Sequence, residues 1–191
     1  MKVVEFFNKH AEHWDDDYTE YNIIRTAIAN LSGAGQGSRV LDIACGTGVM
    51  FPEMLKLNIQ ELVGIDISNK MVQVAQKKFA DKENVRVICK DLLEFNEENF
   101  DIAIMYNAYP HFLNKEATIE QVAKLLGPRG RFTVAHGAGR QVINQCHGNV
   151  PSEISTELRP VVEEAKKFEP WFNVDIICDT PYAYIISGTV K

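Results

Sequence analysis

One stretch of the sequence combines a strand pattern with two glycines and so could hold a ligand against its backbone. Residues Arg39 to Phe51 read RVLDIACGTGVMF. The aliphatic run before Gly46 has the length of a buried strand, and apolar residues resume at helical spacing after Gly48. We therefore expect a strand, a tight glycine turn and a helix, with the backbone of the turn open to a closely approaching ligand.

A carboxylate follows at the interval that suits a nucleoside. The run ELVGIDI, residues 61–67, predicts a second buried strand, and Asp66 near its end lies 20 residues after Gly46. An acidic side chain at the tip of the second parallel strand can accept hydrogen bonds from both ribose hydroxyls. The ligand is therefore expected to carry a ribose.

The same loop is poorly suited to phosphate groups. No Lys or Arg occurs between Val40 and Glu53, and no Gly-Lys-Ser/Thr of a P-loop follows the turn. Phe51 stands where a dinucleotide fingerprint requires a third small residue. Asp42 at the strand end instead favours a ligand with positive ammonium and sulfonium groups.

The segment DIACGTGV resembles the glycine-rich motif of class I S-adenosylmethionine-dependent methyltransferases, with Ala44 at the first glycine. LLGPRGRFTVA resembles the start of the fifth strand in this family, with Arg129 replacing a glycine. The resemblance covers roughly residues 22–191 and is greatest to small-molecule enzymes of the ubiquinone-biosynthesis and arsenite-methylation type. It implies S-adenosylmethionine as cofactor, with adenine held at Asp91-Leu92. The residues expected to contact the cofactor are Asp42, Ala44, Gly46, Gly48, Asp66, Ile67, Met71, Asp91, Leu92, Asn107 and Tyr18.

The alternation of strand and helix patterns predicts an α/β fold. The expected strands are 39–43, 61–67, 84–89, 100–105, 129–136, 172–179 and 183–190, and the expected helices include 22–31, 69–80, 115–126 and 157–168. The last two strands are too close together for a crossover helix and should pair antiparallel. With the sheet order of the resembled family, we expect a three-layer α-β-α Rossmann-like sandwich. Its seven-stranded, mostly parallel sheet would have the order 3-2-1-4-5-7-6 and an antiparallel last strand.

Three histidines and an arginine follow strands at the predicted carboxyl edge of the sheet, where open α/β sheets bind ligands. His111 comes after the fourth strand, and His136, Arg140 and His147 come at and after the end of the fifth. An imidazole suits a general base for an amine or oxygen nucleophile, and Arg140 suits a clamp for an anionic group. The alternatives are structural histidines or three imidazoles around Zn²⁺, although their spacing matches no compact metal motif. We predict no metal.

Composition favours one domain over residues 1–191, in which residues 1–21 form a cap on the core or a lid over the site. The net charge of −6 and the lack of a Lys/Arg cluster argue against a nucleic-acid partner. No signal peptide or membrane-spanning run is recognisable, and four scattered cysteines predict reduced thiols and a cytoplasmic location.

These observations predict S-adenosylmethionine-dependent methyl transfer to a small-molecule acceptor that carries an anionic group. A methyltransferase acting on a protein or nucleic acid is one alternative. A catalytically silent nucleoside- or metal-binding module is another. The acceptor atom and the oligomeric state are left open by the sequence.

Overall fold

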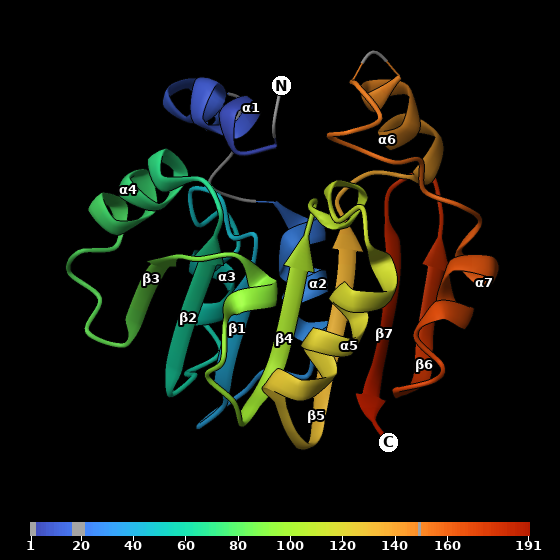
Figure 1. Ribbon diagram of the computed structural model, residues 1–191. Helices are drawn as coiled ribbons and strands as arrows, with labels where there is room; N and C mark the ends of the chain where they lie inside the picture. Colours follow the sequence, from blue (N-terminus) through green and yellow to red (C-terminus); the bar gives the residue numbers. More distant parts are fainter. Residues whose placement is uncertain (1–2, 17–21, 149) are drawn as a thin grey trace.

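The carboxyl edge on which the predicted site depends belongs to a seven-stranded sheet with helices on both faces (Figure 1). The computed structural model describes residues 3–16, 22–148 and 150–191. The strands are β1 (Arg39–Ile43), β2 (Glu61–Asp66), β3 (Val85–Cys89), β4 (Phe100–Tyr106), β5 (Leu126–His136), β6 (Phe172–Asp179) and β7 (Tyr184–Val190). Their order is 3-2-1-4-5-7-6, and β7 alone is antiparallel to its neighbours, which confirms the predicted topology.

The helices predicted over 22–31, 69–80 and 115–126 are present, and each begins and ends within two residues of those bounds. The described helices are α1 (Val3–His10), α2 (Ile23–Leu31), α3 (Phe51–Leu55), α4 (Asn69–Lys78), α5 (Lys115–Leu125), α6 (Arg140–His147) and α7 (Val161–Glu164). Short 3₁₀ turns are η1 (Ala11–His13), η2 (Leu92–Glu94), η3 (Tyr109–His111) and η4 (Ala165–Lys167). The Ser68 hydroxyl accepts a hydrogen bond from the Met71 N–H at 3.2 Å and so caps α4, as a serine at this position should.

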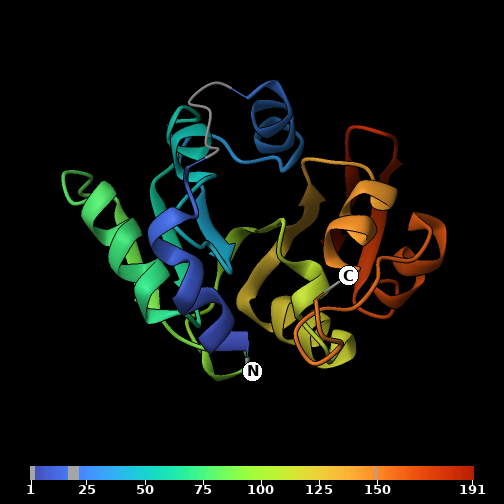
Figure 2. The same cartoon turned by 90° about the horizontal axis from the view of Figure 1, so that it is seen from above.

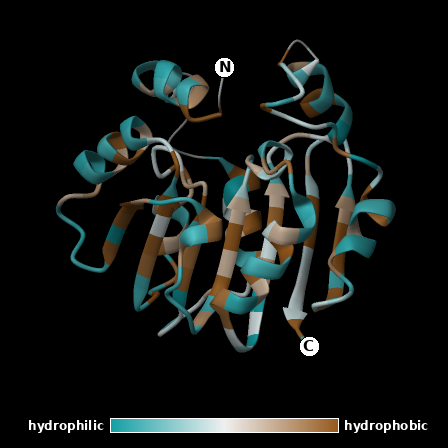
Figure 3. Ribbon diagram, viewed as in Figure 1, coloured by the Kyte–Doolittle hydropathy of each residue, from teal (hydrophilic) through white to brown (hydrophobic). Residues whose placement is uncertain are grey.

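Alternate residues of the buried strands point to opposite faces, and each face has its own helices. Val40 of β1 packs with Ile28 of α2 and Phe51 of α3 on one face. Leu41 packs on the other face, together with Ile119 of α5. Hydrophobic residues accordingly dominate the central strands, whereas the helices carry hydrophilic outer surfaces (Figure 3). This two-sided burial fixes the strands and hence the loops at their carboxyl ends.

Two predicted boundaries were wrong. The helix predicted over 115–126 ends one residue earlier, at Leu125, and β5 starts at Leu126 instead of Arg129. Buried Leu126 pairs with Phe100 of β4, and the register shifts before Ile102, so the glycine and proline lie within an irregular part of the strand. The helix expected over 157–168 is only the short α7 followed by η4, because Pro160 is its N-terminal cap.

Gly188 on β7 allows a test of how β6 and β7 pack at the edge of the sheet. A Cβ at this position would lie 2.5 Å from the Asn173 carbonyl oxygen and 2.8 Å from the Val174 Cα. Gly188→Ala is expected to lower the free energy of unfolding by about 1–3 kcal/mol, because β6 must shift. Urea denaturation measures the change. Gly35→Ala, where nothing lies within 4 Å of the added Cβ, is the control, and equal losses in both variants would contradict the assignment.

Candidate active site

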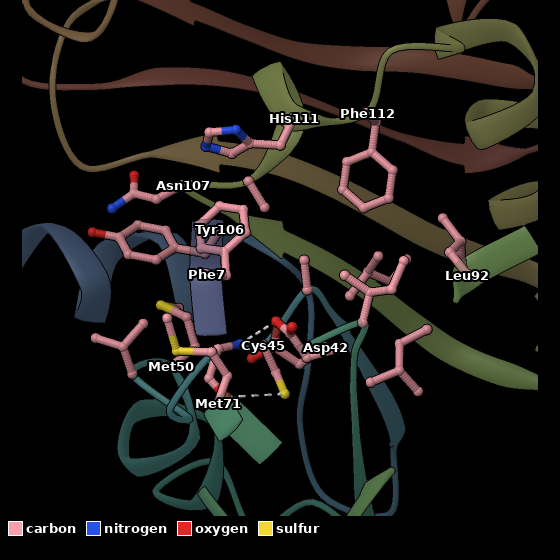
Figure 4. Close-up of a pocket in the computed structure, with 18 of the residues that line it drawn as sticks. Phe7, Asp42, Cys45, Met50, Met71, Leu92, Tyr106, Asn107, His111 and Phe112 are labelled. Atoms are coloured by element: carbon pink, nitrogen blue, oxygen red, sulfur yellow. Dashed lines mark hydrogen bonds between the residues drawn. The ribbon is translucent and has the colours of Figure 1, made fainter. Parts of the chain in front are cut away.

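A cavity of about 670 Å³ lies at the carboxyl ends of β1, β2 and β4, a size typical of small-molecule sites. Seen from above, α1 crosses this edge between α4 and the segment that follows β4 (Figure 2). In Figure 4, Asp42 and Cys45 lie on one side of the cavity and His111 and Asn107 on the other. Phe7 of α1 lies between the two groups.

Asp66, at the end of β2, joins the glycine turn to the start of α4. One carboxylate oxygen accepts a hydrogen bond from the Gly46 N–H at 2.9 Å, and the other accepts from the Ser68 N–H at 2.8 Å. Burial raises the pKa of Asp66, and these two hydrogen bonds oppose the rise. Each oxygen keeps a second lone pair, and Asp66 lines the cavity, so both can also accept from ribose hydroxyls.

Asp42, at the end of β1, contributes a buried carboxylate to the cavity wall. Its carboxylate is 2% exposed, and one oxygen has no hydrogen-bond partner among the residues that the structure describes. Burial, and to a lesser degree the nearby charge of Asp66, hold the pKa of Asp42 well above its usual value. A cationic ligand would offset the cost of burying this group.

At position 44, where the resembled motif has a glycine, this chain has an alanine in a left-handed backbone conformation. Ala44 has φ 54°, a conformation that costs a residue with a Cβ about 1–2 kcal/mol and explains why glycine is usual there. Gly48 has φ 83° and does not line the cavity. A Cβ on Gly48 would lie 2.6 Å from the Phe79 ring and 3.0 Å from Phe51, so this glycine lets α3 and α4 pack beside the turn.

Most of the remaining residues expected to contact the cofactor lie on the wall beyond the ends of β2 and β3. Ile67, Met71, Asp91 and Leu92 line it, and the Asp91 carboxylate caps η2 by accepting from the Leu93 N–H at 2.9 Å. Asn107 lines the opposite wall, where its side-chain oxygen accepts from the Gly137 N–H at 3.0 Å. Tyr18 lies outside the described residues.

His111 is the histidine that faces the cavity. Its Nδ1 lies 3.0 Å from the Ile154 carbonyl oxygen. Since a carbonyl only accepts, Nδ1 carries the proton and Nε2 keeps its lone pair. Burial lowers the pKa of His111 to about 4, and nearby His147 and Lys115 add to the effect. The ring is therefore a neutral hydrogen-bond acceptor at pH 7.

The other predicted catalytic residues do not line the cavity. His136 is the last residue of β5 and is 1% exposed. The His147 ring lies behind His111, with 5.0 Å between ring centroids. The Arg140 guanidinium donates to Asp179 at 3.1 Å. Within the described ranges, no three His, Cys, Asp or Glu side chains are arranged to hold a metal ion.

The described part of the N-terminal segment is bound to the side of the cavity formed by the glycine turn and α4. The Asn8 side-chain oxygen accepts from the Ser68 hydroxyl at 2.8 Å. Asp15 accepts from the Thr47 hydroxyl in the glycine turn at 2.7 Å and pairs with Lys78 of α4 at 3.0 Å. Residues 3–16 therefore cover part of the site, and their movement as a lid stays a prediction.

Residues 40–130 match the family model described as "Methyltransferase domain". The chain is 32% identical over 146 residues to the ubiquinone/menaquinone biosynthesis C-methyltransferase UbiE of Stutzerimonas stutzeri, an alignment that covers 70% of this chain and 57% of that protein. In sequence and in fold, the chain is similar to the class I S-adenosylmethionine-dependent methyltransferases. The chain is also 28% identical over 138 residues to the O-methyltransferase cnsE of Penicillium expansum, covering 66% and 50% of the two chains.

Solved structures show the same fold. The N-methyltransferase NodS of Bradyrhizobium japonicum, crystallised with S-adenosyl-L-homocysteine, superposes with a TM-score of 0.76 at 14% identity, covering 100% of this chain and 99% of that one. The chain spans about half the length of the two curated relatives above. In its described segments, no helix has the length and apolar character to cross a membrane.

Sequence reasoning missed Arg25 as a residue of the cavity wall. Arg25 lies on α2, is 4% exposed and lines the cavity, where its positive charge opposes the rise in the pKa of the buried Tyr106 hydroxyl. A signal was present, because Arg25 precedes buried Ile28 and Ala29 by three and four residues and so shares their helical face. An arginine on a buried face indicates a charged partner or ligand.

The buried His136 makes stability depend on pH. Burial lowers its pKa to about 3, and His147, His111 and Lys115 face it and add to the effect. The unfolded chain then binds more protons below pH 6.5, so stability present above that value is lost on acidification. Wild-type protein is expected to lose about 1.6 kcal/mol of its free energy of unfolding through His136 between pH 6.5 and 5, and His136→Leu should remove this loss, as measured by urea denaturation.

A control variant accompanies this measurement. His13→Gln alters a histidine whose side chain is 80% exposed and should keep the wild-type pH dependence. An unchanged pH dependence in His136→Leu would show that His136 is already protonated in the folded state near pH 5.

Proposed function

We propose that this protein transfers the methyl group of S-adenosylmethionine to a small-molecule acceptor. The observation that carries the proposal is the charge arrangement of the cavity, in which Asp42 and Asp66 lie at the glycine turn and Arg25 lies on α2. A cofactor with a sulfonium, an ammonium and a carboxylate complements these charges, whereas a dinucleotide would bring its phosphates toward two carboxylates.

Each part of the cofactor has a matching group in this chain. Asp66 would accept from the ribose hydroxyls, and Asp91 and the Leu92 N–H would bind adenine. Asp42 would face the positive groups, and Arg25 would pair with the carboxylate. Buried Met71 and half-exposed Ile67 supply apolar surface beside the adenine. Cofactor binding by Tyr18 and Asn107 stays part of the proposal.

When bound, the cofactor supplies an electrophilic methyl carbon. The chain's own contribution is to align an acceptor with that carbon, exclude water and accept a proton. His111 lines the cavity as a neutral imidazole and is the proposed general base. His136 and His147, which do not line the cavity, would act only through His111 as positioning residues.

The acceptor is proposed to be small because α1 covers part of the cavity and the chain has a net charge of −6, which disfavours nucleic acid. The anionic acceptor group was expected from Arg140. That guanidinium is paired with Asp179 and does not line the cavity. The proposed acceptor therefore needs no anionic group.

Calorimetric titration of the protein with S-adenosylmethionine, S-adenosylhomocysteine and NADH tests the cofactor. We expect micromolar dissociation constants for the first two and at least tenfold weaker binding of NADH. Equal or tighter binding of NADH would overturn the proposal. Binding of S-adenosylmethionine without its consumption in the presence of a cell metabolite extract would favour the silent binding module.

A further inference from the structure

Aromatic side chains line the cavity from its middle to the wall opposite the glycine turn. Phe7 comes from α1, Tyr106 from the end of β4, His111 from η3 and Phe112 from the residue after it (Figure 4). The rings of Phe7 and His111 meet edge to face, with 5.0 Å between centroids and an angle of 90°. Flat, apolar surfaces of this kind pack well against a planar ring.

The orientation of the His111 ring is fixed by the segment that precedes α7. Besides the Nδ1 contact to Ile154, the Thr156 N–H and hydroxyl both donate to the Pro110 carbonyl, at 2.9 Å and 3.2 Å. Ile154 is fully buried, so its carbonyl has a set direction. This segment therefore selects one tautomer of His111, in which Nε2 can only accept a hydrogen bond.

We propose that the methyl acceptor is a planar aromatic compound whose hydroxyl group donates a hydrogen bond to Nε2 of His111, with its ring against Phe7 and Phe112. This inference rests on the proposed methyl transfer. In the reaction the hydroxyl proton passes to Nε2 and the oxygen forms a bond to the methyl carbon. The bond from that carbon to sulfur breaks and leaves its electron pair on sulfur. The imidazolium then returns its proton to water.

A carboxylate in the same place would have no proton to donate. Its oxygen and the Nε2 lone pair would repel unless the ring were protonated, and burial together with His147 and Lys115 opposes protonation of His111. A neutral hydroxyl therefore matches this wall better than an acidic group of the same size.

Nuclear magnetic resonance of ¹⁵N-histidine-labelled protein, saturated with S-adenosylhomocysteine, tests the inference. The His111 signals are assigned by their loss in His111→Gln, and the exposed His13→Gln serves as control. At pH 7 we expect an unprotonated Nε2 that shifts when phenol is added. Phenol should bind at least tenfold more tightly than benzoate, a matched ring with a carboxylate.

A protonated Nε2, or benzoate binding as tightly as phenol, would overturn the inference. So would a complex that binds neither compound. Calorimetry with S-adenosylhomocysteine on the same sample separates these failures from failure of the proposed function, because loss of cofactor binding would count against methyl transfer itself. The tautomer is still measurable in the free protein.

Discussion

Replacing His111 with glutamine is expected to slow methyl transfer by about 10²–10⁴-fold and to leave the affinity for S-adenosylmethionine unchanged. Glutamine is polar and of similar length but cannot take up a proton at neutral pH. His111 lies on the wall opposite Asp42, so the variant should bind the cofactor normally (Figure 4). Single-turnover rates with a hydroxyl acceptor, beside calorimetry with the cofactor, separate the two effects.

The pH dependence of the same rate provides the control. Because the pKa of His111 is lowered to about 4, its neutral form persists at all higher pH values, and the wild-type rate should fall only toward that value. His111→Gln should lose this acidic limb, whereas His13→Gln should keep the wild-type profile and rate. A fall in rate beginning near pH 6.5, or a His111→Gln variant with wild-type turnover, would contradict the role assigned to this ring.

Replacing Asp66 with alanine is expected to weaken S-adenosylmethionine binding by about 10–100-fold. Hydrogen bonds to a charged group contribute about 1.5–3 kcal/mol, and 1.4 kcal/mol corresponds to a factor of ten. The loss should be similar for adenosine, which keeps the ribose, and absent for adenine, which lacks it. Calorimetry with the three ligands measures the difference.

Asp66 also accepts from the Gly46 and Ser68 N–H groups, so a general distortion of the turn has to be separated from loss of the ribose contact. Asp66→Asn retains one acceptor oxygen and should lose less affinity than the alanine variant. Asp175→Ala removes a half-exposed carboxylate paired with Arg131 and should bind like wild type. Equal losses for adenine and adenosine would show that the turn itself has changed.

The parts of the site that could be predicted from the sequence belong to short, continuous segments. The glycine turn and Asp66 each depend on residues a few positions away or on the tip of one strand. Their local patterns therefore placed them correctly. The same holds for the two antiparallel strands at the end of the chain, whose short connection left no room for a crossover helix.

The parts that could not be predicted depend on contacts between distant segments. Arg140 follows β5 as expected, but its guanidinium pairs with Asp179, 39 residues away. His136 ends β5 at the predicted edge, yet Tyr184 of β7 packs beside it and it is buried outside the cavity. A strand end fixes where a residue lies along the sheet and leaves open which loops will cover it.

The cavity is built from two kinds of structure, and this division has an evolutionary consequence. The wall that suits the cofactor is joined to β1, β2 and α4, whose residues also hold the sheet together. Apart from Tyr106 at the end of β4, the wall that suits the acceptor comes from α1, η3 and Phe112. These residues are supported by the segment around Ile154, and none of them belongs to a strand of the sheet. Substitutions in the second group can change the compound that is methylated at little cost to folding. New acceptors can therefore arise in a lineage of such proteins while the cofactor and the sheet stay the same.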